Sequence, residues 1–129
     1  MKKILMTGAS GFIGSHLIKD LTKNFKIRCL VRKNLKFQHP NIEIIQGNLN
    51  SKKILKEACN DIDIIIHLAA QKYNTKNLEQ MRQVNVTGTK NLLKVAGRAH
   101  FIYISTWLAT YPEKTGLYGQ TKKEAEKEV

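Results

Sequence analysis

The sequence predicts an α/β fold in which about five parallel strands form a doubly wound sheet between two layers of helices. Short apolar runs alternate with segments of helical periodicity along the chain, and a glycine-rich turn joins the first apolar run to the first helical segment. The length of 129 residues suits one domain with one hydrophobic core. We therefore expect residues 1–129 to form a single three-layer αβα domain.

Five apolar runs have the length and composition of buried strands. The most apolar run, DIIIHLA at residues 63–69, is nearly continuous, which is typical of a parallel strand covered on both faces. The others are KILMT, KIRCLV, IEIIQ and FIYIS, at residues 3–7, 26–31, 42–46 and 101–105, and a polar loop containing Pro40 precedes the third of the five.

Helical patterns separate most of these strands. In the first helical segment, apolar residues recur at helical spacing, as Ile13 and Leu17 illustrate. The second follows Asn50 or Ser51, either of which can cap its N-terminus. The third is weakened in its middle by β-branched residues and Gly88. The predicted helices span residues 11–24, 51–59, 78–99 and 117–129.

The net charge of +12 raises the question of nucleic-acid binding. The basic residues are scattered over the whole length, their longest runs are pairs, and aromatic residues do not alternate with them. This distribution favours a lysine-rich solvated surface over a nucleic-acid site. Excess positive charge would still attract anionic ligands such as phosphates.

Cys29 and Cys59 have no neighbouring His or Cys at ligand spacing, so we expect buried free thiols rather than a disulfide, and no metal site. No stretch approaches the ~18 apolar residues of a membrane span, and the apolar run after Lys2-Lys3 is too short for a secretory signal. We therefore expect a cytoplasmic protein.

Gly8, Gly11 and Gly14 lie in TGASGFIG, between the first predicted strand and the first predicted helix. In that context they allow a tight turn, close approach of the backbone to a diphosphate, and close packing of helix on strand. A P-loop would instead need Gly-Lys-Ser/Thr, whereas Gly14 precedes Ser15-His16. The turn therefore predicts a Rossmann-like dinucleotide site, with His16 as a packing or surface residue.

Arg32 and Lys33 follow the second strand, where a dinucleotide site usually has an acid that binds the ribose hydroxyls. Two cations there would attract a 2′-phosphate, so the sequence favours NADP over NAD. Alternatively, Lys33 is ordinary loop charge and only Arg32 contributes, or neither does.

Six motifs in order resemble those of the extended short-chain dehydrogenase/reductases, the group that includes nucleotide-sugar epimerases and dehydratases. The resemblance covers essentially all of the chain. Its motifs are TGASGFIG, GNLN at 47–50, HLAA at 67–70, VNVTGTKNLL at 84–93, FIYIST at 101–106 and YGQTK at 118–122.

The resemblance implies which residues contact the cofactor. Asn48 stands where the family usually has Asp, and its amide can still bond the adenine amino group, so we expect weakened recognition. The implied contacts are Gly8, Gly11, Phe12, Ile13 and Gly14 at the diphosphate, Asn48 and Leu49 at the adenine, Leu68, Ala69, Ala70, Lys72 and Asn85 along the cofactor, and Tyr118 and Lys122 at its nicotinamide end.

Tyr118 and Lys122 are four residues apart and share one face of the last predicted helix. A tyrosine with a pKa of about 10 is a poor base at neutral pH, and a nearby ammonium favours the phenolate. The resemblance makes this pair the acid/base and adds a hydroxyl, best matched by Thr106 with Ser105 as competitor. Taken alone, the pair would be read as chance spacing and helix packing.

Members of this family are usually well over twice as long, so we expect this chain to stop before the last strands and the substrate region. The resemblance implies an NAD(P)-dependent epimerase, dehydratase or reductase acting on a nucleotide sugar or related alcohol or carbonyl compound. The alternative is a non-catalytic NADP-binding sensor. At the exposed sheet edge we expect a second copy or a complementing C-terminal half.

Overall fold

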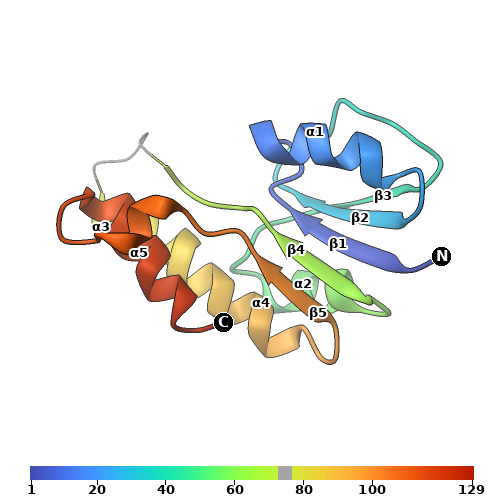
Figure 1. Ribbon diagram of the computed structural model, residues 1–129. Coiled ribbons are helices and arrows are strands. Elements are labelled where there is room, and N and C mark those ends of the chain that lie inside the picture. Colours follow the sequence, from blue (N-terminus) through green and yellow to red (C-terminus); the bar gives the residue numbers. More distant parts are fainter. Residues whose placement is uncertain (73–76) are drawn as a thin grey trace.

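The computed structural model describes residues 1–72 and 77–129 and contains one sheet of five parallel strands. The strand order is β3-β2-β1-β4-β5, which confirms the predicted doubly wound α/β class (Figure 1). The strands are β1 (Lys3–Thr7), β2 (Lys26–Val31), β3 (Ile42–Gln46), β4 (Ile64–His67) and β5 (His100–Tyr103).

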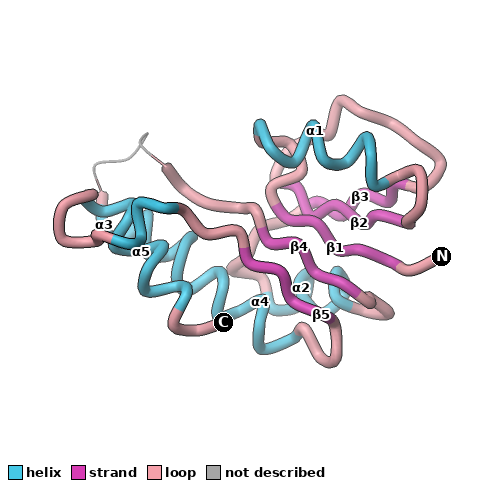
Figure 2. The backbone as a smooth tube through the Cα atoms, viewed as in Figure 1, coloured by secondary structure: helices cyan, strands magenta, loops and turns pink. Residues whose placement is uncertain are grey.

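Helices cover the two faces of the sheet unequally. Helix α1 (Phe12–Leu21) lies on one face, while α2 (Lys52–Cys59), α4 (Gly88–Val95) and α5 (Gly116–Glu126) lie on the other (Figure 1). A loop without a helix joins β2 to β3, as expected from its polar sequence and Pro40 (Figure 2). Among the described residues no helix is both long and apolar enough to span a membrane.

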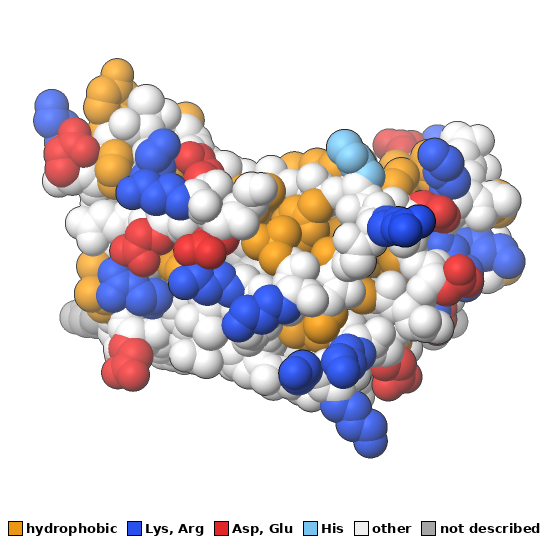
Figure 3. All heavy atoms as spheres, turned by 90° about the horizontal axis from the view of Figure 1, so that it is seen from below, with side chains coloured by type: hydrophobic (Ala, Val, Ile, Leu, Met, Phe, Trp, Pro, Cys, Tyr) orange, Lys and Arg blue, Asp and Glu red, His pale blue; other side chains and the backbone are white. Residues whose placement is uncertain are grey.

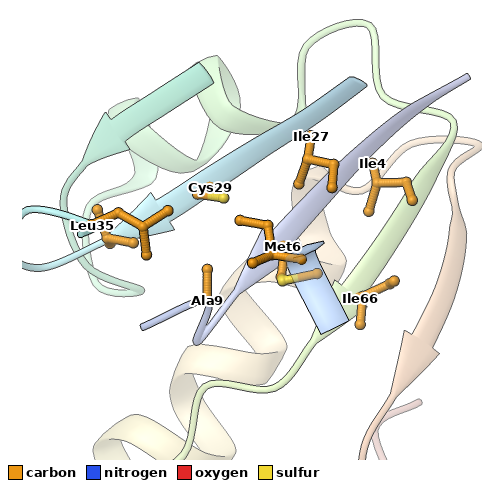
Figure 4. Packing of buried hydrophobic residues seen from close by; sticks show 9 residues of the cluster. Ile4, Met6, Ala9, Ile27, Cys29, Leu35 and Ile66 are labelled. Atoms are coloured by element: carbon orange, nitrogen blue, oxygen red, sulfur yellow. The ribbon is translucent and has the colours of Figure 1, made fainter. Parts of the chain in front are cut away.

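Alternate residues of β1 to β4 supply two hydrophobic cores, one on each face, and β5 contributes to one of them. Met6 faces α1 and packs in a cluster with Ile18, while Leu5 packs on the opposite face with Leu55 and Leu92. This alternation follows from the period of two in a strand. Figure 4 shows the first cluster, with Ile4, Met6, Ala9, Ile27, Cys29, Leu35 and Ile66 labelled.

The predicted helix over 78–99 is three consecutive segments. Helix α3 (Leu78–Arg82) continues into a π-helical turn, η1 (Gln83–Thr87), and then into α4. The π-helical turn coincides with the weak middle of the sequence pattern. The prediction was too long at its C-terminal end, because Gly97 adopts a positive φ of 61° that ends the helix after Val95.

The other boundaries differ by a few residues. Ser51 caps α2 by accepting a hydrogen bond from the backbone N–H of Ile54, as one of the two expected caps. Strand β4 ends at His67, so Leu68 and Ala69 leave the ladder and begin the loop at the sheet edge. Helix α5 ends at Glu126 instead of continuing to the last residue.

Arg28 is a charged residue inside an otherwise apolar strand, and it lies 9% exposed. Its Nη1 donates to the carbonyl oxygens of Glu57, Ala58 and Asn60 at the end of α2, and its Nε pairs with Glu43 at 2.9 Å. These bonds satisfy carbonyls that a helix end leaves without partners. Arg28 therefore fixes α2 against the sheet.

Lysine and arginine side chains are spread over the molecular face seen from below, with acidic groups between them (Figure 3). Three basic side chains of the described residues pair with acids of α5 and the chain end: Arg82 with Glu124, Lys123 with Glu126, and Lys90 with Glu128. Positive charge is thus dispersed on the face of Figure 3, and part of the positive charge of the molecule is neutralised by ion pairs.

Candidate functional site

A cleft of about 560 Å³ lies at the carboxyl ends of the parallel strands. Its walls come from the β1–α1 turn, the end of β2, the loop after β3, the segment after β4 and the start of α5. Here the strand order reverses, because β1 lies between β2 and β4. In open α/β sheets this switch point is the usual place for a ligand.

The structure brings most of the expected site residues together in this cleft. Two of them, Asn85 and Thr106, do not line it. Those that do are Gly8, Gly11, Phe12, Ile13, Gly14, Arg32, Asn48, Leu49, Leu68, Ala69, Ala70, Lys72, Tyr118 and Lys122.

The glycine turn packs so closely that side chains are excluded at two of its positions. Gly8 has φ of 74°, and a Cβ there would lie 2.7 Å from the backbone nitrogen of Ala69. A Cβ on Gly14 would collide with the backbone of Gly8 and Ala9. The turn therefore holds β1, α1 and the segment after β4 at backbone contact.

The first turn of α1 has no side-chain cap at Gly11. Its N–H groups and the positive end of the helix dipole therefore remain available to an anion in the cleft. Beside them, Phe12 and Ile13 line the cleft and are 82% and 53% exposed. His16, one turn further along, is exposed, and its ring nitrogen contacts the carbonyl oxygen of Phe12.

The far end of the cleft carries Arg32 and Asn48, both exposed. The backbone carbonyl oxygen of Arg32 accepts a hydrogen bond from the Gln46 side-chain amide at 3.3 Å. Asn48 Oδ1 accepts a hydrogen bond from the backbone N–H of Asn50 at 2.8 Å, so its amide is oriented by its own loop. Lys33 does not line the cleft.

Helix α5 places Tyr118 and Lys122 on its buried face toward the cleft. Lys122 is 2% exposed; its Nζ donates to the Ile104 carbonyl oxygen at 2.6 Å and lies 4.2 Å from the Tyr103 ring centroid. Burial lowers the pKa of the Lys122 ammonium to about 8, Glu126 opposes this change, and Lys72 adds to it.

Of the two hydroxyl candidates, Ser105 lines the cleft and Thr106 does not. Thr106 caps the short helix η2 (Trp107–Thr110) by accepting a bond from the Leu108 backbone N–H. Ser105 Oγ donates to Glu126 Oε1 at 2.5 Å. In this conformation the residue favoured by the motif serves the local turn, and its competitor faces the cleft.

Asn85 lies behind the cleft wall and is 1% exposed. Its Oδ1 accepts from the backbone N–H of Gln71, and its Nδ2 donates to the Gln71 carbonyl oxygen and to Thr121 Oγ1. Because Asn85 occupies the π-helical turn, its amide reaches both the segment after β4 and helix α5. It fixes these two cleft walls relative to each other.

Sequence reasoning missed a buried polar chain centred on His67, which is fully buried at the end of β4. Its ring nitrogens contact Thr7 Oγ1 at 2.6 Å and Thr89 Oγ1 at 2.9 Å. The signal was present in the sequence, because a histidine ends the most apolar strand and threonines stand at the end of β1 and in the central helix.

The direction of the hydrogen bonds through His67 follows from the last of them, between Thr89 and Asn85. Thr89 Oγ1 donates to the Asn85 carbonyl oxygen at 2.7 Å, so it accepts from His67 Nε2–H. His67 Nδ1 therefore accepts from the Thr7 hydroxyl, whose oxygen in turn accepts from the Ala69 backbone N–H. Burial and the nearby Lys122 hold the pKa of His67 down to about 3, so the ring is neutral.

The sequence profile of the NAD dependent epimerase/dehydratase family matches residues 4–128. The chain belongs to this family. The resemblance to short-chain dehydrogenase/reductases is thereby confirmed, and with it the Rossmann-like fold.

Relatives in this family act on different substrates. The chain is 32% identical to a sterol-4-alpha-carboxylate 3-dehydrogenase of Candida albicans over 162 residues, covering 100% of this chain and 45% of that protein. It is 30% identical to the UDP-glucose 4-epimerase of Vibrio cholerae, covering 99% and 46%. The chain thus spans less than half the length of these relatives.

A solved structure has the same arrangement. MoeE5 in complex with UDP-glucose and NAD superposes with a TM-score of 0.83 and 26% identity, over 97% of this chain and 47% of that one. The chain therefore corresponds to about half of that larger structure.

The buried neutral His67 predicts a pH dependence of stability in this family member. Its folded pKa lies below the ordinary value of 6.5, so its contribution is complete above pH 6.5 and is lost as the pH falls toward about 3. In that window the free energy of unfolding should fall by about 1.4 kcal/mol per pH unit for this group alone.

The free energy of unfolding of the wild type and of His67→Gln is measured by urea unfolding at several pH values between about 3 and 7. Glutamine does not titrate in this range. The difference between the two proteins should shrink as the pH falls. His16→Gln, at an exposed position, serves as control and should keep the wild-type slope. A pH-independent difference for His67→Gln would contradict the neutral buried ring.

Proposed function

We propose that this chain binds a nicotinamide dinucleotide and supplies the acid/base of an epimerase, dehydratase or reductase. One observation carries the proposal: a single cleft joins the glycine turn before α1 to Tyr118 and Lys122 on α5. The cofactor supplies hydride exchange at its nicotinamide ring. The residues of this chain supply binding, orientation and proton transfer.

The cleft fits a dinucleotide at its diphosphate position. A Cβ at Gly8 or Gly14 would collide with backbone, so the chain there is bare and can approach a ligand closely. Uncapped N–H groups of α1 face the same place, and the cleft also holds the cations Lys72 and Arg32. Leu49, Leu68 and Ala70 would bound the flat rings of the cofactor.

Lys122 would act twice in the chemistry. At neutral pH its ammonium is mostly protonated, because its pKa is about 8, and a cation beside Tyr118 favours the phenolate. The same ammonium, at the cleft wall, would also bond the ribose of the cofactor. Tyr118 would then take a proton from a substrate alcohol, or return one to a carbonyl, with Ser105 or Thr106 holding the substrate oxygen.

We further propose that the cleft prefers NADP to NAD, because Arg32 is exposed at the end of β2 and lines the cleft. A guanidinium there can bind a 2′-phosphate, and no acid from this position competes for the ribose hydroxyls. The relative MoeE5 was solved with NAD, so both cofactors are to be tested.

The substrate class is proposed from the relatives, which include a UDP-glucose epimerase and a sterol dehydrogenase. Both names describe ring compounds bearing an alcohol or ketone, and we propose a substrate of this kind.

We also propose that the β5 edge, which pairs only with β4 among the described strands, is covered by a complementing polypeptide or a second copy.

Cofactor binding is tested by calorimetric titration with NAD⁺ and NADP⁺. Ile13→Glu places a carboxylate in the first turn of α1 beside the diphosphate position and should weaken binding roughly tenfold or more through charge repulsion. His16→Glu, exposed on the same helix but outside the cleft, should bind normally. Absence of saturable wild-type binding would overturn the proposal.

The role of Tyr118 is tested by Tyr118→Phe, which keeps the ring and removes the proton. Cofactor affinity should stay within about threefold, while the rate of product formation from UDP-glucose or a sterol-4-alpha-carboxylate, followed by chromatography because epimerisation and dehydration leave no net reduced cofactor, should fall by roughly a hundredfold or more. Equal turnover by the variant would exclude Tyr118 as acid/base. Cofactor binding without any wild-type turnover, also after addition of a complementing C-terminal half, would instead favour the non-catalytic sensor.

The role of Arg32 is tested by Arg32→Gln. Affinity for NADP⁺ should fall roughly tenfold, because one charge-assisted contact to the 2′-phosphate is lost, while affinity for NAD⁺ should change little. Lys33→Gln is the matched control, since Lys33 is adjacent but does not line the cleft. Equal loss for both cofactors would argue against a 2′-phosphate contact.

A further inference from the structure

The proposed acid/base pair lies beside a cluster of groups of which the motifs singled out only Ser105. The Lys122 ammonium lies over the Tyr103 ring, and the Ser105 hydroxyl bonds the Glu126 carboxylate; these groups come from β5, the segment after it, and α5. Three of these four groups titrate, and Glu126 alone of them can carry a negative charge at neutral pH.

Glu126 has specific partners on two sides. Its Oε1 accepts from Ser105 Oγ at 2.5 Å, and its Oε2 accepts from Lys123 Nζ at 3.1 Å. Ser105 lines the cleft and Glu126 does not, so a carboxylate outside the cleft lining holds a hydroxyl that belongs to it. These bonds and the charges of Lys123 and Lys122 keep the pKa of the Glu126 carboxyl below its usual range.

Lys122 needs this negative charge because its own surroundings disfavour an ammonium. It is 2% exposed, and its ammonium contacts the carbonyl oxygen of Ile104 and the face of Tyr103. Lys72 acts against its charge, and the neutral His67 provides none in its favour. Glu126, one helical turn further along α5, is the acid that acts on Lys122 in the opposite sense.

The Tyr103 hydroxyl is the driest part of this cluster, whereas the Glu126 side chain is 32% exposed. Its Oη is buried and has no hydrogen-bond partner among the described residues. Burial raises the pKa of this phenol, and the nearby Glu126 and Tyr118 raise it further, so Tyr103 stays neutral. The ring therefore offers its face to the Lys122 ammonium and no charge.

We propose that Glu126 is a positioning residue for the Tyr118–Lys122 pair: its carboxylate orients the Ser105 hydroxyl at the cleft and keeps the Lys122 ammonium charged. This inference rests on the proposed function for its catalytic meaning. The effect of the Glu126 carboxylate on the charge state of Lys122 does not depend on a bound cofactor.

The test is the titration of Lys122 in cofactor-free protein, followed by NMR of ¹³C-labelled lysine side chains. The Lys122 signal is assigned by its loss in Lys122→Arg. In Glu126→Gln, which keeps a hydrogen-bond acceptor for Ser105, the pKa of Lys122 should fall by roughly half a pH unit or more. Glu124→Gln is the control: it removes the same charge from the same helix, and Glu124 pairs with Arg82 instead.

The pH dependence of NAD⁺ affinity gives a second readout. The wild type should lose affinity as the pH rises through about 8, where the Lys122 ammonium discharges, and Glu126→Gln should lose it at lower pH. An unchanged Lys122 pKa in folded Glu126→Gln would overturn the inference and reduce Glu126 to a link between α5 and the segment after β5.

A third variant covers the case in which Glu126→Gln does not fold. Lys123→Gln removes the cation that shares the Glu126 carboxylate and should raise the pKa of Lys122; no change or a fall would contradict the inference. Absence of NAD⁺ binding with a shifted Lys122 titration would refute the proposed function while leaving the role of Glu126 intact.

Discussion

The cleft depends on the buried hydrogen-bond chain that runs through His67. Burying polar groups in an apolar sheet costs free energy unless each finds a partner, and here every link is supplied by a different element. Thr7 ends β1, His67 ends β4, and Thr89 lies on α4. From there the chain passes to the Asn85 carbonyl, while the amide of the same residue reaches Thr121 on α5. Each hydroxyl both donates and accepts, so all these hydrogen bonds run in one direction. They are compatible with only one arrangement of the strands and helices that carry them.

Cations surround the space that this framework encloses. Arg32, Lys72 and Lys122 line the cleft, and the positive end of α1 opens into it. Their mutual repulsion is offset when an anion enters, which makes the cleft selective for negatively charged ligands before any specific contact forms. The net charge of +12 works in the same direction over longer range, although salt screens it beyond about 10 Å.

Much of the fold could be predicted from the sequence because apolar runs and the glycine turn are local signals. The five strands, the loop around Pro40 and the Ser51 cap all follow from neighbouring residues. Strand and helix ends were less accurate, since they depend on tertiary contacts. Gly97 ends a helix through a backbone conformation that the pattern of apolar residues does not encode.

Residues of the cleft could be predicted from the sequence where the backbone conformation determines their position. Prediction was less accurate where a residue lines the cleft only because of the direction of its side chain. Gly8 and Gly14 follow from the spacing of small residues, whereas Ser105 and Thr106 are adjacent and point differently only because η2 uses Thr106 as its cap. From the sequence, His67 in IIIHLA was interpreted only as part of an apolar strand. Its partners Thr7 and Thr89 are 60 and 22 residues away, so no local pattern joins them.

The π-helical turn at Gln83–Thr87 gives the long helix a built-in intolerance to changes in length. Such a turn contains one residue more than the surrounding α-helix can accommodate in register. Deleting a single residue there would let the α-helical hydrogen bonds run continuously; the flanking helical segments would stay in register, while side chains within the turn would change direction by up to about 100°, the angle per residue of an α-helix. Asn85 would then leave Gln71 and Thr121, and the two cleft walls would lose their link. In this segment the number of residues is therefore constrained as strictly as their identity.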